Sequence, residues 1–102
     1  MKVIDFESWT WFLFEHEGVF YLDANCSMGA FSYTYMIQLN EAELASYQSD
    51  GREYLRKLAH DIHYSVPLSK DTKSIYKGRN VSEELSELAT ETAKAWRESN
   101  NK

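Results

Sequence analysis

The sequence predicts an α+β fold, in which an antiparallel meander of three strands, or of four, packs against a long helix and a second helix follows at the C-terminal end. Three observations lead to this fold. Aromatic-rich segments lie between residues 9 and 39, separated by turns that contain glycine. Two later segments begin with a helix-capping pattern and carry apolar residues three and four positions apart. Residues 1–102 suffice for one domain, and 43% hydrophobic residues exclude intrinsic disorder.

The expected strands are residues 9–14, 19–26 and 31–39, with tight turns at Glu17-Gly18 and Met28-Gly29. The third strand alternates apolar and polar side chains, which is typical of a strand buried on one face. Residues 2–7 allow a short edge strand, but the pattern there is too brief to decide.

Two-residue turns at these positions determine which residues face one another across each hairpin. The first turn places Leu13 opposite Leu22. The second places Leu22 opposite Tyr35 and Cys26 opposite Phe31. Both hairpins then agree on one apolar core face, which supports the register because a one-residue slip would invert every side chain. This face consists of Trp9, Trp11, Leu13, Phe20, Leu22, Ala24, Cys26, Phe31, Tyr33, Tyr35 and Ile37. The opposite face consists of Thr10, Phe12, Phe14, Tyr21, Asp23, Asn25, Ser32, Thr34, Met36 and Gln38.

A capping box from Asn40 to Glu43 opens the first helix, which we expect over about 41–64. Gly51 interrupts it at a cost of about 1 kcal/mol relative to alanine. This glycine either allows close packing on the sheet or marks a kink, and Pro67 prevents any continuation of the helix. The apolar stripe comprises Leu44, Tyr47, Gly51, Leu55, Leu58 and Ile62.

The capping pattern recurs from Asn80 to Glu83 and opens a second helix, which we expect over about 81–99. Residues 65–80 form the loop between the helices. The stripe of the second helix comprises Val81, Leu85, Leu88, Ala89, Thr92, Ala93 and Trp96.

The formal net charge is −5 and is unevenly distributed. Residues 1–26 carry one lysine against five acidic residues, whereas residues 67–80 carry Lys70, Lys73, Lys77 and Arg79 against Asp71. An acidic domain repels nucleic acid and attracts a basic protein, so we expect no nucleic-acid partner. The competing interpretation is that the basic loop binds nucleic acid, with Tyr76 stacking on a base.

The sequence also predicts a cytoplasmic protein with no membrane partner. No run approaches the roughly 18 apolar residues that a membrane span requires. The segment from Met1 to Glu7 lacks the basic and then apolar pattern of a secretory signal. A single cysteine, Cys26, forms no internal disulfide, which fits a reducing compartment.

Candidate catalytic and metal-binding residues are sparse, and we expect no enzyme, no cofactor and no metal. His60 and His63 could both bind a metal, but His16 has no reason to converge on them. Cys26 could act as a nucleophile, but it lies on the core face. The acidic pairs could supply general acid–base groups, but each has a local explanation. Glu15/Glu17 flank a hairpin tip, and Glu41/Glu43 and Glu83/Glu84 lie in the first turns of helices, where the helix dipole favours acids.

The candidate partner-binding surface lies on the second sheet face and at the first hairpin. Phe12, Phe14, Tyr21 and Met36 fall together on that face, with Asp23 beside them. The second helix covers them, or they form an interface with a partner. The full candidate set is Phe12, Phe14, Glu15, Glu17, Tyr21, Asp23 and Met36.

The segment from Gly29 to Leu44, followed by Tyr47, Gly51-Arg52, Leu55, Leu58-Ala59 and Ile62, resembles small acidic bacterial proteins with a sheet followed by a capped helix. These are immunity proteins of contact-dependent growth inhibition and of related polymorphic-toxin systems. The resemblance implies a cytoplasmic, non-enzymatic inhibitor that neutralises a cognate toxin domain, often a basic nuclease. The alternatives are a homodimeric structural or accessory protein and, third, a small enzyme.

Overall fold

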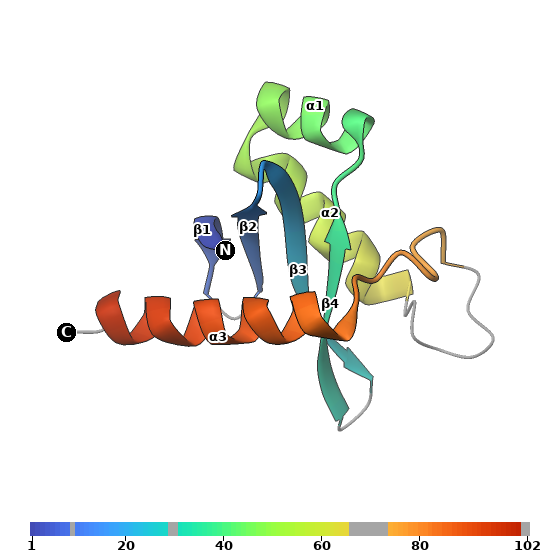
Figure 1. The fold of residues 1–102 in the computed structure, drawn as a ribbon. Coiled ribbons are helices and arrows are strands. Elements are labelled where there is room, and N and C mark those ends of the chain that lie inside the picture. Colours follow the sequence, from blue (N-terminus) through green and yellow to red (C-terminus); the bar gives the residue numbers. More distant parts are fainter. Residues whose placement is uncertain (9, 29–30, 66–73, 101–102) are drawn as a thin grey trace.

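The structure is a computed structural model that describes residues 1–8, 10–28, 31–65 and 74–100. It confirms the α+β class, with four strands and three helices along the described chain (Figure 1). The edge strand that the sequence left open is present. The elements are β1 (Lys2–Glu7), β2 (Trp11–His16), β3 (Val19–Met28), β4 (Phe31–Gln38), α1 (Glu41–Asp50), α2 (Arg52–Ser65) and α3 (Glu83–Asn100).

The four strands form an antiparallel sheet in the order β1-β2-β3-β4. The first hairpin has the predicted register, in which His16 pairs with Val19 and Leu13 with Leu22. Glu17 and Gly18 make the turn with φ values of 54° and 81°. A two-residue hairpin turn of the type that matches strand twist requires such positive values.

The predicted register of the second hairpin is wrong by two residues. Cys26 pairs with Tyr33 rather than with Phe31, and pairing continues to Met28 and Phe31, so Met28 belongs to the strand. Residues 29–30 lie outside the described part of the chain. Because side chains alternate with a period of two, a two-residue shift leaves every described side chain on its predicted face.

Both faces of the sheet are covered, so the fold has a helix layer on either side (Figure 1). The predicted core face packs against α2, where Leu55, Leu58 and Ile62 are buried. The opposite face packs against α3 through Ala89 and Ala93. Trp9, which was expected on the core face, lies outside the described residues.

The helix expected over about 41–64 is divided at Gly51, which ends α1 and separates it from α2. Of the two roles that the sequence left open for this glycine, the structure has the interruption. Gly51 has φ 69° and ψ −145°, a backbone conformation open mainly to glycine. Its N–H still donates to the carbonyl of Tyr47, at 2.7 Å. The predicted capping box at the start of α1 is present, with Asn40 and Glu43 each bonding the other's backbone N–H.

The predicted cap of the second helix is also wrong, because α3 begins at Glu83 behind Ser82 rather than behind Asn80. The Ser82 hydroxyl accepts from the N–H of Leu85, at 3.3 Å. Asn80 instead forms an isolated β-bridge with Ile37 of β4. Asn80 therefore forms a tertiary backbone contact instead of the helix cap that the local sequence pattern predicts.

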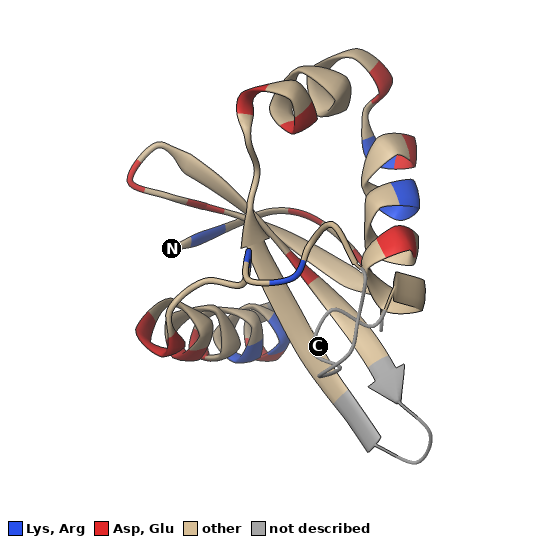
Figure 2. Cartoon of the chain, turned by 90° about the vertical axis from the view of Figure 1, so that its right-hand side faces the viewer, with Lys and Arg blue, Asp and Glu red and all other residues tan. Residues whose placement is uncertain are grey.

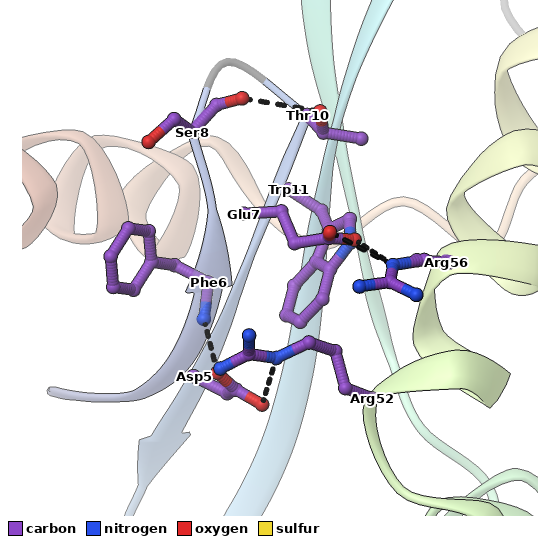
Figure 3. Close-up of polar contacts among 8 residues, drawn as sticks. All are labelled: Asp5, Phe6, Glu7, Ser8, Thr10, Trp11, Arg52 and Arg56. Carbon is purple, nitrogen blue, oxygen red and sulfur yellow. Dashed lines mark hydrogen bonds and ion pairs between the residues drawn. The ribbon is translucent and has the colours of Figure 1, made fainter.

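Ion pairs attach the edge strand β1 to α2 (Figure 3). Arg52 lies 2.7 Å from Asp5, and Arg56 lies 2.8 Å from Glu7. Glu7 also accepts from the indole Nε1 of Trp11, at 2.8 Å. These contacts join β1, β2 and α2 along one side of the sheet. No described helix is long and apolar enough to cross a membrane.

Candidate functional site

The apolar part of the predicted partner-binding surface is buried under α3. Phe14 and Met36 are 0% and 2% exposed, and Phe12 and Tyr21 are also buried. Trp96 of α3 packs edge-on against Phe12, with ring centroids 5.7 Å apart. Of the two alternatives left by the sequence, the structure has the one in which the second helix covers this face. In the single chain these four side chains are core.

The polar members of the predicted set lie at separate places. Glu17 is exposed in the β2–β3 turn, and Glu15 precedes it on β2. Asp23 lies further along β3, where it pairs with Phe12 on one side and Met36 on the other. The structure therefore brings Asp23, but no other predicted acid, to the boundary between the sheet and α3.

A cavity of about 240 Å³ opens at this boundary. The aromatic side chains of the sheet give way there to short polar ones, and α3 presents Thr90 and Ala93 opposite them. Because the side chains are short on both sides, they leave a space between the sheet and α3. Next to the cavity, the aromatic side chains fill the corresponding space. The lining consists of Thr10, Trp11, Phe12, Asp23, Asn25, Thr34, Thr90, Ala93 and Arg97.

Asp23 supplies the one carboxylate in this lining. Its Oδ1 atom is buried and has no hydrogen-bond partner among the described residues. Burial raises the pKa of Asp23 to about 6, because an apolar setting disfavours the charged form. A buried carboxyl with a raised pKa that lines a cavity is a candidate functional group.

The rest of the cavity divides into a buried floor and an exposed rim. Trp11, Phe12 and Ala93 are buried and form the floor. The guanidinium of Arg97 lies over the Phe12 ring, 5.2 Å from its centroid. The exposed rim residues are Thr10, Asn25, Thr34, Thr90 and Arg97. The cavity thus offers a carboxylate, hydroxyl and amide groups and an apolar wall.

The other sequence candidates do not assemble into a reactive centre in the described part of the chain. Cys26 is buried, and burial raises the pKa of its thiol to about 11, with the Asp23 charge adding to the effect. His60 and His63 pack their rings against Tyr64, with centroids 4.3 Å and 4.7 Å away. Among the described residues, no three His, Cys, Asp or Glu side chains gather where they could hold a metal ion.

The described part of the basic loop is structural. Tyr76 is buried, and its carbonyl accepts from the hydroxyl of Tyr35, at 2.7 Å. Its ring is therefore not presented to a base. Arg79 is paired with Glu43. Lys70 and Lys73 lie outside the described residues.

Sequence reasoning placed Asp23 beside an apolar patch but missed the cavity and its helix residues Thr90 and Arg97. One signal was present: an acid lies beside the apolar patch on that sheet face, and the stripe of the second helix, one of the two alternatives for covering the patch, contains alanine and threonine. Comparisons with protein-family models, curated proteins and solved structures give no match for this chain.

Proposed function

We propose that this chain is a non-enzymatic protein-binding domain, most concretely a cytoplasmic, immunity-type inhibitor that neutralises a cognate basic toxin domain such as a nuclease. The observation that carries the proposal is the exposed acidic side of α3. Its apolar side faces the sheet through Ala89 and Ala93, so its glutamates face outward. Figure 2 shows acidic positions on this helix.

The first half of α3 carries acidic residues without an intervening cation. Glu83, Glu84, Glu87 and Glu91 are all exposed, and Lys94 is the first basic residue of the helix. A shallow depression of about 330 Å³ lies among them, lined by Glu83, Ser86, Glu87, Thr90 and Glu91. Thr90 also lines the Asp23 cavity, so the acidic side of α3 and the cavity adjoin one another.

A basic partner matches this surface on electrostatic grounds. A nuclease holds phosphate with cationic side chains, so a row of carboxylates can occupy the same cations and block the substrate. The surrounding negative field also steers such a partner toward the domain. We therefore propose the outer, acidic side of α3 as the contact surface, in place of the aromatic face that α3 covers.

The burial of Cys26 favours a binding role over catalysis by a cysteine nucleophile. A thiol needs to ionise to act as a nucleophile, and burial raises the pKa of this one to about 11. The homodimer alternative relied on the same aromatic face, which is core in the single chain.

The proposal is tested by co-expression with the C-terminal domain of the protein encoded immediately upstream. The chain should restore growth of cells that this domain kills and should form an equimolar complex with it in sedimentation. The triple variant Glu83→Lys, Glu87→Lys, Glu91→Lys should lose protection. A matched variant on α1 and α2, Asp50→Lys, Glu53→Lys, Asp61→Lys, has the same change in charge and should keep it.

Two results would contradict the proposal. One is full protection by a folded α3 triple variant, which would exclude the acidic side of α3 as the contact surface. The other is a stable homodimer of the isolated chain that does not bind the upstream domain, which would favour the accessory-protein alternative.

A further inference from the structure

We propose that the Asp23 cavity receives the side chain of one lysine or arginine of the partner protein, an inference that rests on the proposed function. Asp23 lines this cavity, and its Oδ1 atom is buried without a hydrogen-bond partner among the described residues. A cation in the cavity would lie beside the Asp23 carboxylate and compensate its charge.

The size of the cavity suits one side chain. Pockets for whole cofactors and drug-sized ligands range over about 300–1,000 Å³, and this one is about 240 Å³. The residues that line the cavity also match the two parts of a lysine or arginine side chain, the apolar methylene groups and the charged end. The buried wall of Trp11, Phe12 and Ala93 can pack along the methylene groups, and Asp23 can accept from the charged end.

Besides Asp23, the cavity lining contains one charged group, the guanidinium of Arg97. β2 contributes Trp11 and Phe12 to the cavity and β4 contributes Thr34, none of them charged. From α3, Arg97 lines the cavity and holds its guanidinium over the Phe12 ring. Arg97 would repel an entering cation, whereas it would attract an anion, so its replacement distinguishes the two ligand classes.

The cavity adjoins the acidic side of α3, which supplies continuity with the proposed contact surface. Thr90 belongs to both the cavity lining and the depression among the glutamates. A basic partner lying along α3 would therefore have a cationic residue within reach of the cavity. The glutamates would attract the partner, and Asp23 would hold one side chain in a defined place.

The first test uses propylguanidinium and butylammonium ions as probes, with propionate and butanol as anionic and neutral controls. Both cations should bind saturably to the purified chain and shift the backbone amide resonances of Asn25 and Thr34. Asp23→Asn should abolish this binding, and Asp61→Asn on the exposed side of α2 should retain it. Arg97→Ala should tighten cation binding several-fold.

The pH dependence provides an independent measure. With an Asp23 pKa of about 6, the carboxylate is about one-tenth ionised at pH 5 and almost fully ionised at pH 7.5. Cation affinity should rise about tenfold over this interval in the unmodified chain and should not rise in Asp23→Asn. Propionate binding that strengthens toward pH 5 and is lost in Arg97→Ala would overturn the proposal in favour of an anion site. No saturable shift with either cation up to about 100 mM would also overturn it.

The second test identifies the source of the cation. With the upstream toxin domain as partner, Asp23→Asn should raise the dissociation constant at least tenfold without weakening folding, and Asp61→Asn should leave it unchanged. If the probes bind at Asp23 but Asp23→Asn leaves partner affinity intact, the cavity takes a free amine and the partner assignment is wrong. Failure of the α3 triple variant to affect the partner would instead contradict the proposed function, so the two failures are distinguishable.

Discussion

Arg79 forms a two-point ion pair with Glu43, with its Nη1 2.7 Å from Oε2 and its Nη2 2.6 Å from Oε1. The same guanidinium donates to the carbonyl of Gln38, at 2.9 Å. Glu43 also completes the capping box with Asn40, at 2.9 Å. The ion pair of Arg79 and Glu43 thus joins the N-terminus of α1, the end of β4 and the segment that leads to α3.

Removing the Glu43 charge should destabilise the fold. Glu43→Gln should lower the free energy of unfolding at pH 7 by about 1–3 kcal/mol, because charge-assisted bonds to a largely buried carboxylate are lost. Burial raises the pKa of Glu43, but the hydrogen bonds from Arg79 and Asn40 outweigh it and hold the pKa below its ordinary 4.5. The stabilisation is therefore present above pH 4.5 and disappears as the pH falls through the lower, folded pKa.

Urea unfolding of Glu43→Gln at pH 7 and at pH 3 measures this difference. Glu41→Gln, an exposed position in the same first turn, serves as the control and should cost less. Equal effects of the two substitutions at pH 7 would show that the helix dipole, rather than the ion pair, accounts for the loss.

Asp23→Asn should stabilise the protein at pH 7. The pKa of Asp23 is raised from 3.8 to about 6, so the folded state holds its proton more tightly than the unfolded state. This penalty is absent below pH 3.8, grows as the pH rises, and is complete above pH 6. At about 1.4 kcal/mol per pKa unit it reaches at most about 3 kcal/mol, and an unpaired amide offsets part of the gain.

Thermal unfolding from pH 4 to pH 7.5 tests this sign. The unmodified chain should lose stability relative to Asp23→Asn across the interval, and Asp61→Asn should run parallel to the unmodified chain. A less stable Asp23→Asn at pH 7 would indicate that the carboxylate has a partner in solution.

Gly51→Ala should destabilise the protein by about 1–3 kcal/mol. In a continuous helix the same substitution would stabilise by about 1 kcal/mol, so the sign decides between the two structures. Gly51 has positive φ, and a Cβ there would meet no atom within 4 Å. The cost is therefore purely conformational. Chemical denaturation measures it, with Ser49→Ala in α1 as a control that should be neutral or slightly stabilising.

Cys26 should react slowly with thiol reagents in the folded protein. With a pKa of about 11, only about one thiol in ten thousand is ionised at pH 7. Modification should accelerate strongly in urea. Cys26→Ser should reduce stability by about 1–3 kcal/mol, because it buries a hydroxyl in an apolar site. Growth protection should survive in this variant and in His60→Ala, His63→Ala; a stable variant without activity would contradict a non-enzymatic role.

Association with a basic partner should slow as salt rises. The screening length falls from about 30 Å at 0.01 M to about 10 Å at 0.1 M salt, so stopped-flow rates should drop over that range. Charge reversal at the α3 glutamates should lower the on-rate most, and reversal of Glu15 and Glu17 should show whether the hairpin contributes. Loss of binding in Lys70, Lys73 and Lys77 variants alone would favour the nucleic-acid interpretation.

The sequence alone was enough to predict the fold class, the first hairpin and the sides of the sheet on which residues lie. These depend on short-range rules: alternation with a period of two, turns that need glycine, and capping by Asn40. The prediction that Leu22 and Tyr35 share a face was therefore correct, although the pairing of the second hairpin was wrong by two residues. An even shift in register leaves the alternation intact.

Only the tertiary structure decided whether α3 covers the aromatic face, where the helix at Gly51 ends, and what Asn80 bonds to. Each of these depends on contacts between segments far apart in the sequence. The cavity at Asp23 is of the same kind, since it exists because short side chains of α3 meet short side chains of β3 and β4. A sequence shows the acid among apolar residues, but packing determines whether its carboxylate is buried beside an empty space.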